Sequence, residues 1–194
     1  GTVLLEANLS GRNAKGADAN PLAVLISQVK TTYIEKERLL KTKDRILSSA
    51  KRLDIDNYFE TTPISYWFST TTIVQLRRLE CAIKRIKNDQ QKKFFLTCFS
   101  SLVRKVSFAD PSISVPVRLN PERFVNHKDR MDSTLFKIKT LENVDVYDKF
   151  ENICELNISR IETLRNIFDN GVKSEVISND ARNLTATIGS KTKL

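Results

Sequence analysis

Two aspartates stand directly after short stretches that could be buried strands. Asp18 closes the small-residue stretch 13–18, and Asp180 follows the apolar stretch 175–179. If both stretches are parallel strands of one sheet, the two carboxylates lie at its carboxyl edge, where ligands of open α/β sheets bind. A carboxylate at that edge can accept hydrogen bonds from hydroxyl or amino groups of a ligand. The alternative for each aspartate is structural, because Asp often caps a following helix.

The sequence contains few histidine and cysteine residues that could bind a metal ion. His127 is the single histidine, and Cys81, Cys98 and Cys154 are far apart in apolar stretches. Zinc sites need clustered cysteine and histidine ligands, so we expect no metal. An odd number of dispersed cysteines favours reduced core residues over a disulfide framework. No secretory signal and no apolar run near the ~20 residues of a membrane span is visible. These features predict a soluble, cytoplasmic protein.

The first 32 residues predict the elements that would position Asp18. A helix is expected over Thr2–Leu9, a strand over 13–18 and a second helix over Pro21–Lys30. Asn20 is a suitable cap for that second helix, since Asn is favoured at the N-cap and Pro at the first helical position. Helix, strand and helix within about 30 residues fit half of a doubly wound unit.

The middle of the chain predicts long amphipathic helices, because apolar residues recur at helical spacing. Three prolines between 109 and 124 indicate an extended or irregular segment there. The polar segment 126–139 has no clear pattern. Helices are expected around 34–53, 73–86, 94–106 and 140–170, followed by a short strand over 175–179.

Composition and charge limit the classes of partner. Hydrophobic residues make up 40% of the 194 residues and charged residues 28%, which suits a packed core. The net charge of +9 favours a polyanionic binding partner such as nucleic acid. Lys and Arg outnumber acids by nine to two between 77 and 105. This basic helical pair could follow phosphates, although a solvated basic surface is the simpler alternative.

The chain opens with Gly1-Thr2-Val3-Leu4-Leu5 and continues as Gly16-Ala17-Asp18-Ala19-Asn20-Pro21. This order resembles the S-adenosylmethionine-dependent DNA amino-methyltransferases, which modify adenine N6 or cytosine N4. In that family a Gly-rich loop ending in Gly-Thr leads into a helix. A strand then ends in an acidic residue, often followed by a small or hydrophobic residue, Asn and Pro. The stretch Val176-Ile177-Ser178-Asn179-Asp180-Ala181-Arg182 is similar to a later family motif, a strand followed by Asp-Ala-Arg.

The resemblance implies S-adenosylmethionine as cofactor and assigns residues to it. Asp18 would accept hydrogen bonds from both ribose hydroxyls, Ala19 would lie beside the adenine ring, and Asp180 would contact the adenine amino group. The implied cofactor-binding residues are Gly1, Thr2, Asp18, Ala19, Asn20, Asp180 and Ala181.

The helical region is similar to one found between these two motifs in a subset of the family. Its aromatic residues 66–68 and 94–95 also suit a plain hydrophobic core. The implied partner is DNA, with Arg104, Lys105, Arg118 and Arg123 as candidate contacts. A solvated loop is the alternative for Arg118 and Arg123.

The catalytic motif of this family is missing. It reads Asp, Asn or Ser, then Pro-Pro, then Tyr or Phe, and it holds the target amine while its aromatic ring stacks on the flipped base. No Pro-Pro pair occurs in the 194 residues, so we expect no catalytic residue in this chain. The front of the Gly-rich loop is also absent before Gly1. We expect a sequence cut at both ends or a split gene product, inactive alone and weak in cofactor affinity.

The sequence therefore predicts an α/β fold: a partial Rossmann-like methyltransferase sheet of few strands with a dominant helical insertion. Residues 1–32 would form the first part of the cofactor-binding unit, 33–170 the helical insertion, and 171–194 the return to the sheet. An incomplete sheet leaves strand edges open, so a homodimer could form. Two alternatives remain. One is an RNA methyltransferase, and the other is a basic, mainly helical nucleic-acid- or partner-binding module without catalysis.

Overall fold

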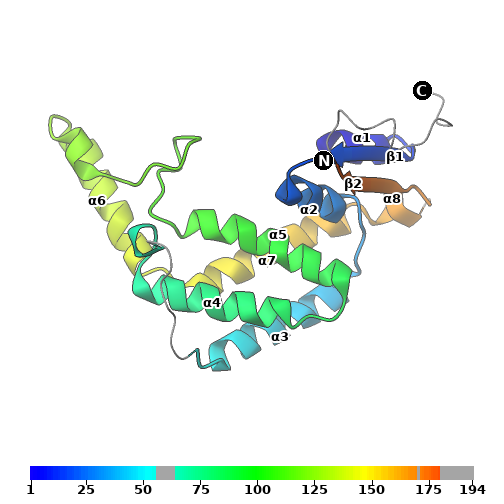
Figure 1. Cartoon of the computed structure of the whole chain (residues 1–194), viewed down its shortest axis with the longest axis horizontal. Coiled ribbons are helices and arrows are strands. Elements are labelled where there is room, and N and C mark those ends of the chain that lie inside the picture. Colours follow the sequence, from blue (N-terminus) through cyan, green and yellow to red (C-terminus); the bar gives the residue numbers. More distant parts are fainter. Residues whose placement is uncertain (56–63, 170, 180–194) are drawn as a thin grey trace. The chain divides into compact units, whose positions relative to one another are not determined.

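A computed structural model describes residues 1–55, 64–169 and 171–179 of the chain (Figure 1). This part is mixed α/β, with a small parallel sheet and mostly helices. The elements in chain order are α1 (Thr2–Leu9), β1 (Ala14–Asp18), α2 (Pro21–Lys30), α3 (Lys36–Arg52), the 3-10 turn η1 (Ile64–Tyr66), α4 (Thr70–Lys84), α5 (Asp89–Lys105), the 3-10 turn η2 (Pro121–Phe124), α6 (Lys128–Glu142), α7 (Val146–Glu162), α8 (Arg165–Asp169) and β2 (Ser174–Ser178).

The chain divides into two compact units. The first contains residues 1–40, 88–97 and 156–194, and the second contains residues 41–87 and 98–155. The first unit therefore holds β1 and β2, and the second holds α4 and α6 whole. The sheet and the candidate DNA-contacting arginines consequently belong to different units.

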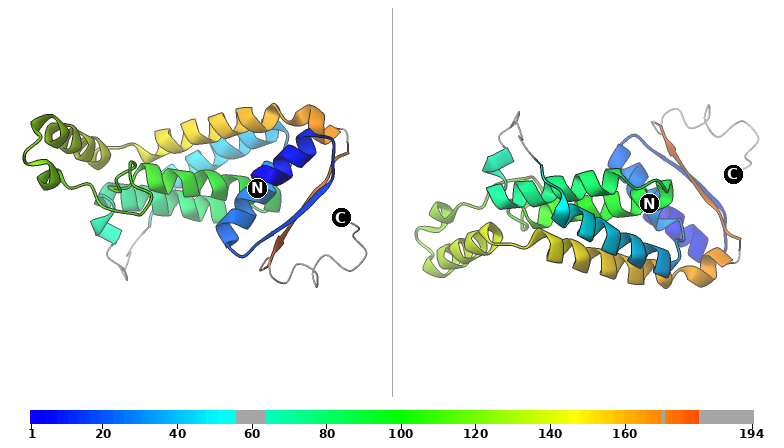
Figure 2. Two further views of the ribbon diagram at one scale, coloured as in Figure 1. Left: turned by 90° about the horizontal axis from the view of Figure 1, so that it is seen from above. Right: turned by 90° about the horizontal axis from the view of Figure 1, so that it is seen from below.

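The sheet of the first unit joins two segments that are far apart in sequence. β1 and β2 are parallel, with Ala14 opposite Ser174 and Asp18 opposite Ser178, and Figure 2 shows them side by side. Both strands were predicted, and their presence confirms the expected mixed α/β character. An ion pair of 2.8 Å between Lys15 Nζ and Glu175 Oε2 links the strands on one face.

Helices α1 and α2 both contact the sheet. α1 runs opposite to β1 (Figure 1), because only the turn at Gly11, with φ of 71°, separates them. Gly16 allows this approach: a Cβ there would lie 3.1 Å from Leu4 Cδ1. Gly11 needs its positive φ, which glycine adopts without steric cost. α1 and α2 thus provide the buried side chains Leu4 and Val24 near the sheet.

The second unit has a core made from the apolar stripes that the sequence predicts. Its fully or nearly fully buried side chains include Leu79, Ala82, Ile83, Leu102, Val106, Phe150 and Cys154. Cys98 and Cys154 are both buried in this core. Burial raises the pKa of the Cys154 thiol, and its hydrogen bond with Cys98 raises that pKa further.

Two expectations about the helices need correction. The unassigned polar segment 126–139 lies largely in α6, a helix with no buried residue. The single helix expected over 140–170 is wrong, because α6 ends at Glu142 and α7 starts at Val146. Asp145 begins α7 by accepting hydrogen bonds at Oδ1 from the backbone N–H groups of Tyr147 (2.9 Å) and Asp148 (3.2 Å). These bonds satisfy donors that the first turn of a helix leaves free.

The aromatic residues have two different environments. Phe94 and Phe95 are buried core residues whose rings pack edge to face, with centroids 5.1 Å apart. Trp67 is only half-buried, and its carbonyl accepts a hydrogen bond of 2.8 Å from the N–H of Phe108. This bond anchors the Pro-containing segment after α5, which is irregular, as its prolines predict, apart from the short turn η2 and an antiparallel bridge between Ala109 and Arg118.

Candidate functional site

The carboxyl ends of β1 and β2 lie together at one edge of the sheet. Asp18 is opposite Ser178, and the N–H of Asn179 donates a hydrogen bond of 3.2 Å to the carbonyl oxygen of Asp18. α2 begins at Pro21, directly beside this edge. The pairing brings Asp18 and Asn179 together although 161 positions separate them in sequence (179 − 18). We call residues 18–20 and 178–179 the carboxyl edge.

Asp18 has an exposed side chain with one local hydrogen bond. Its Oδ1 accepts from the backbone N–H of Asn20 at 2.9 Å. Within the described part of the chain it forms no ion pair. A carboxylate has about four acceptor positions, so this bond leaves Asp18 able to accept hydrogen bonds from a ligand.

Asn20 is the N-cap of α2. Its Oδ1 accepts a hydrogen bond of 2.9 Å from the N–H of Leu22, as the sequence predicts for Asn before Pro. The Asn20 side chain therefore has a structural role at the start of α2. Asp18 is not the cap of α2, but its hydrogen bond to the N–H of Asn20 orients the turn before the helix. The start of α2 also presents positive partial charge at this edge.

The other residues assigned to the cofactor are placed less directly. Gly1 is the N-cap of α1, and Thr2 is its first residue. Since α1 runs opposite to β1, both lie toward the same end of the first unit as Asp18. A Cβ on Gly1 would lie 2.7 Å from Ser27 Oγ, so the start of α1 packs closely against α2. Asp180 and Ala181 lie outside the described residues, two and three positions after the end of β2.

The four candidate DNA contacts all belong to the second unit. Arg104 and Lys105 end α5, and Arg123 lies in η2. Arg118 has aromatic partners: its guanidinium carbon lies 4.8 Å from the ring centroid of Tyr66 and 5.2 Å from that of Phe108. Cation–π contacts of this kind hold Arg118 in place within the second unit.

Sequence reasoning missed a buried lysine. Lys43 has a side chain that is 5% exposed, and its Nζ lies 2.6 Å from Glu151 Oε1 and 2.7 Å from Glu155 Oε1. Burial alone would lower the pKa of Lys43, but the hydrogen bonds to the two carboxylates raise it above its ordinary value. The acids at 151 and 155 come from α7, one helical turn apart, so each contacts the same ammonium. This cluster joins α3 to α7 within the second unit.

No metal centre or membrane helix is found where the structure describes the chain. In residues 1–55, 64–169 and 171–179, no three His, Cys, Asp or Glu side chains group as metal ligands would. Over the same ranges, no helix has the length and apolar character to cross a membrane.

The fold and the carboxyl edge define a mixed α/β chain with a parallel strand pair and a helix N-terminus beside it. Comparison with known proteins finds a similarity to a methyltransferase. The chain is 28% identical, over 165 residues and 79% of its length, to the Type II methyltransferase M.MvaI of Kocuria varians. It spans 36% of the length of that relative. No family model and no solved structure matches the chain.

Proposed function

We propose that this chain is part of an S-adenosylmethionine-dependent DNA methyltransferase, and that the carboxyl edge forms part of its cofactor cleft. The supporting observation is the parallel pairing of β1 and β2, which aligns Asp18 with Ser178. A helical module without chemistry has no reason to align these two segments. The similarity to a Type II methyltransferase, which extends over 79% of the chain, also supports the proposal.

The residues at this edge suit the proposed cofactor. Asp18 is exposed and can accept the ribose hydroxyls, while Ala19 adds no bulk where the adenine ring would lie. Asp180 would accept a hydrogen bond from the adenine amino group. When bound, S-adenosylmethionine supplies a methyl group on a positively charged sulfur. The role of these residues is to bind and orient it.

The target is an exocyclic amino group, adenine N6 or cytosine N4. The long helical region between β1 and β2, residues 33–170, would be an insertion in the cofactor-binding sheet. We propose DNA as the substrate because of the net charge of +9 and the methyltransferase relative. An RNA substrate would use the same cofactor residues.

A titration followed by nuclear magnetic resonance tests the cofactor site and detects weak binding. S-adenosylhomocysteine, the unreactive product, is added to the ¹⁵N-labelled chain up to millimolar concentration. We expect saturable amide shifts at residues 18–20 and 178–181. Asp18→Asn, which removes the negative charge, should weaken binding at least fivefold.

The matched control is Asp132→Asn, which removes an exposed acid from α6 in the other unit. Its titration should follow that of the unchanged chain. Absence of saturable shifts at millimolar concentration would sink the methyltransferase proposal. The better account would then be a basic helical module that binds nucleic acid.

A further inference from the structure

Helix α3 and the end of α4 form an open groove in the second unit that the sequence did not point to. Its volume is about 640 Å³. The side chains that line it are predominantly long and basic or small and polar: Lys41, Asp44, Arg45, Ser48, Ser49, Arg52, Leu53 and Arg85. We call this the α3–α4 groove, and all of its residues belong to the second unit.

The cations of this groove have no acidic partners among the described residues. Lys41, Arg45, Arg52 and Arg85 are all exposed, and none forms an ion pair there. Other cations of the second unit do pair, such as Lys84 with Glu80 at 2.7 Å. The four unpaired cations leave the groove with excess positive charge.

Asp44 is the one acid that lines the groove. Its carboxylate offsets one of the four cations, so the lining keeps an excess of positive charge. Ser48 and Ser49 add hydroxyl groups that can donate hydrogen bonds to an anion. The lining is therefore suited to negatively charged oxygen atoms.

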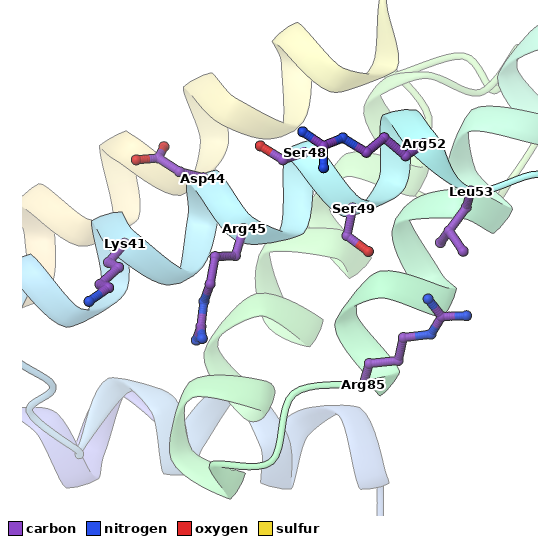
Figure 3. A pocket seen from close by; sticks show the side chains of 8 residues that line it. All are labelled: Lys41, Asp44, Arg45, Ser48, Ser49, Arg52, Leu53 and Arg85. Carbon is purple, nitrogen blue, oxygen red and sulfur yellow. The ribbon is translucent and has the colours of Figure 1, made fainter.

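The groove is elongated along α3. Figure 3 shows Lys41 and Arg45 leaving α3 on the side where Arg85 lies, while the guanidinium of Arg52 extends back toward Ser48. From 41 to 52 the helix rises by roughly 16 Å, at 1.5 Å per residue. One strand of DNA has a charge about every 3.4 Å along the axis, so this length faces several phosphates.

We propose that the α3–α4 groove binds the phosphodiester backbone of duplex DNA, with Arg45 and Arg85 as the principal contacts. The choice of DNA as the polymer rests on the proposed function. The contact is independent of base sequence, because the groove offers charge and hydroxyl groups to phosphates and no set of groups arranged to distinguish bases. A single phosphate would occupy only part of the groove, so its length favours a polymer.

Fluorescence anisotropy with a labelled 20-base-pair duplex of mixed sequence tests this assignment over a series of salt concentrations. Each lost phosphate contact reduces the slope of log K against log salt by about 0.9. We expect the double variant R45Q/R85Q to lower the slope by about 2 and the affinity at least tenfold. The charge-preserving double variant R45K/R85K should keep the original slope.

The matched control is R12Q/R130Q, which removes two exposed arginines that also lack acidic partners among the described residues. Its net charge equals that of R45Q/R85Q, so it measures general electrostatic attraction. Equal weakening by both double variants would overturn the groove assignment. Absence of duplex binding by the unchanged chain would do the same. So would equal competition by polyglutamate at matched charge, which would indicate an acidic protein partner.

The proposals for the groove and for the carboxyl edge can be rejected independently of each other. R45Q/R85Q should bind S-adenosylhomocysteine like the unchanged chain, and Asp18→Asn should bind the duplex like the unchanged chain. Groove-dependent DNA binding without cofactor binding would reject the methyltransferase and keep the groove. Cofactor binding without groove-dependent DNA binding would reject only the proposal that the groove binds DNA.

Discussion

At the scale of single residues, Lys43 combines burial with charge more than any candidate site residue does. It forms ion pairs with Glu151 and Glu155 and is nearly inaccessible to solvent. Removing the two carboxylates leaves a buried charge uncompensated, whereas removing the lysine leaves two half-exposed carboxylates that water can solvate, so the first change costs more. This asymmetry distinguishes a structural ion cluster from a surface contact.

The double variant E151Q/E155Q should lower the free energy of unfolding by about 3 kcal/mol, since it leaves the buried Lys43 ammonium with only the longer contact to Asp44. Lys43→Met should cost only about 1 kcal/mol, because a similar volume stays filled. Urea denaturation followed by circular dichroism measures both. Lys41→Met, on the exposed side of α3, is the control and should be near neutral. A larger loss for Lys43→Met than for the double variant would contradict this account.

The pKa of Lys43 gives this cluster a pH dependence with a definite sign. Its pKa in the folded chain is raised above the ordinary value of 10.5. The cluster therefore contributes its full stability below pH 10.5 and loses it as the pH rises through the folded pKa. The difference in unfolding free energy between the unchanged chain and Lys43→Met should accordingly narrow above pH 10.5.

No sequence pattern could have identified Lys43. Its neighbours Lys41 and Asp44 are exposed, and a lysine on an amphipathic helix normally belongs to the solvated face. Its partner Glu151 is 108 positions away, so only the packing of α3 against α7 shows that they meet. Asn20 was predictable because the capping signal depends on adjacent residues alone.

At the scale of elements, α2 depends on its cap. Asn20→Ala should reduce the free energy of unfolding by about 1 kcal/mol, because the N–H of Leu22 loses its acceptor. Asn20→Ser, which keeps an acceptor, should recover most of that loss. Thermal denaturation of the two variants makes the comparison. Equal stability of Asn20→Ala and the unchanged chain would show that the cap contributes nothing.

Helix α6 differs from the other long helices because it buries none of its side chains. Hydrophobic periodicity detects a helix by its buried face, which explains why the polar segment 126–139 was not assigned. The strongly striped helices α3, α4 and α5 were predicted from that face. The break before α7 was missed because Asn143 and Asp145 lie within a continuous series of apolar positions.

Because little packing stabilises α6, its amides should exchange with deuterium much faster than those of α4. α4 buries five residues: Thr72, Leu76, Leu79, Ala82 and Ile83. Local opening of α6 exposes almost no apolar surface, so its free-energy cost is low. Peptide-level mass spectrometry should show at least tenfold lower protection in α6. Equal protection would mean that another molecule, such as a second copy of the chain, covers this helix.

At the scale of the whole molecule, we expect the chain to bind the cofactor without transferring its methyl group. The sequence has no Pro-Pro-Tyr or Pro-Pro-Phe motif to hold a target amine. We expect no methyl transfer from tritiated S-adenosylmethionine to mixed-sequence duplex DNA by this chain alone. Detectable radioactivity in the DNA, absent from a heat-denatured control, would contradict this expectation.

The two buried cysteines in the core of the second unit make its opening measurable. Cys81 is partly exposed, so a thiol-reactive dye should label it quickly. Cys98 and Cys154 are buried, so the dye should react with them only after the second unit opens. The slow phase of dye incorporation therefore reports the opening rate with the natural cysteines. The same measurement with a DNA duplex would show whether an occupied α3–α4 groove slows that opening.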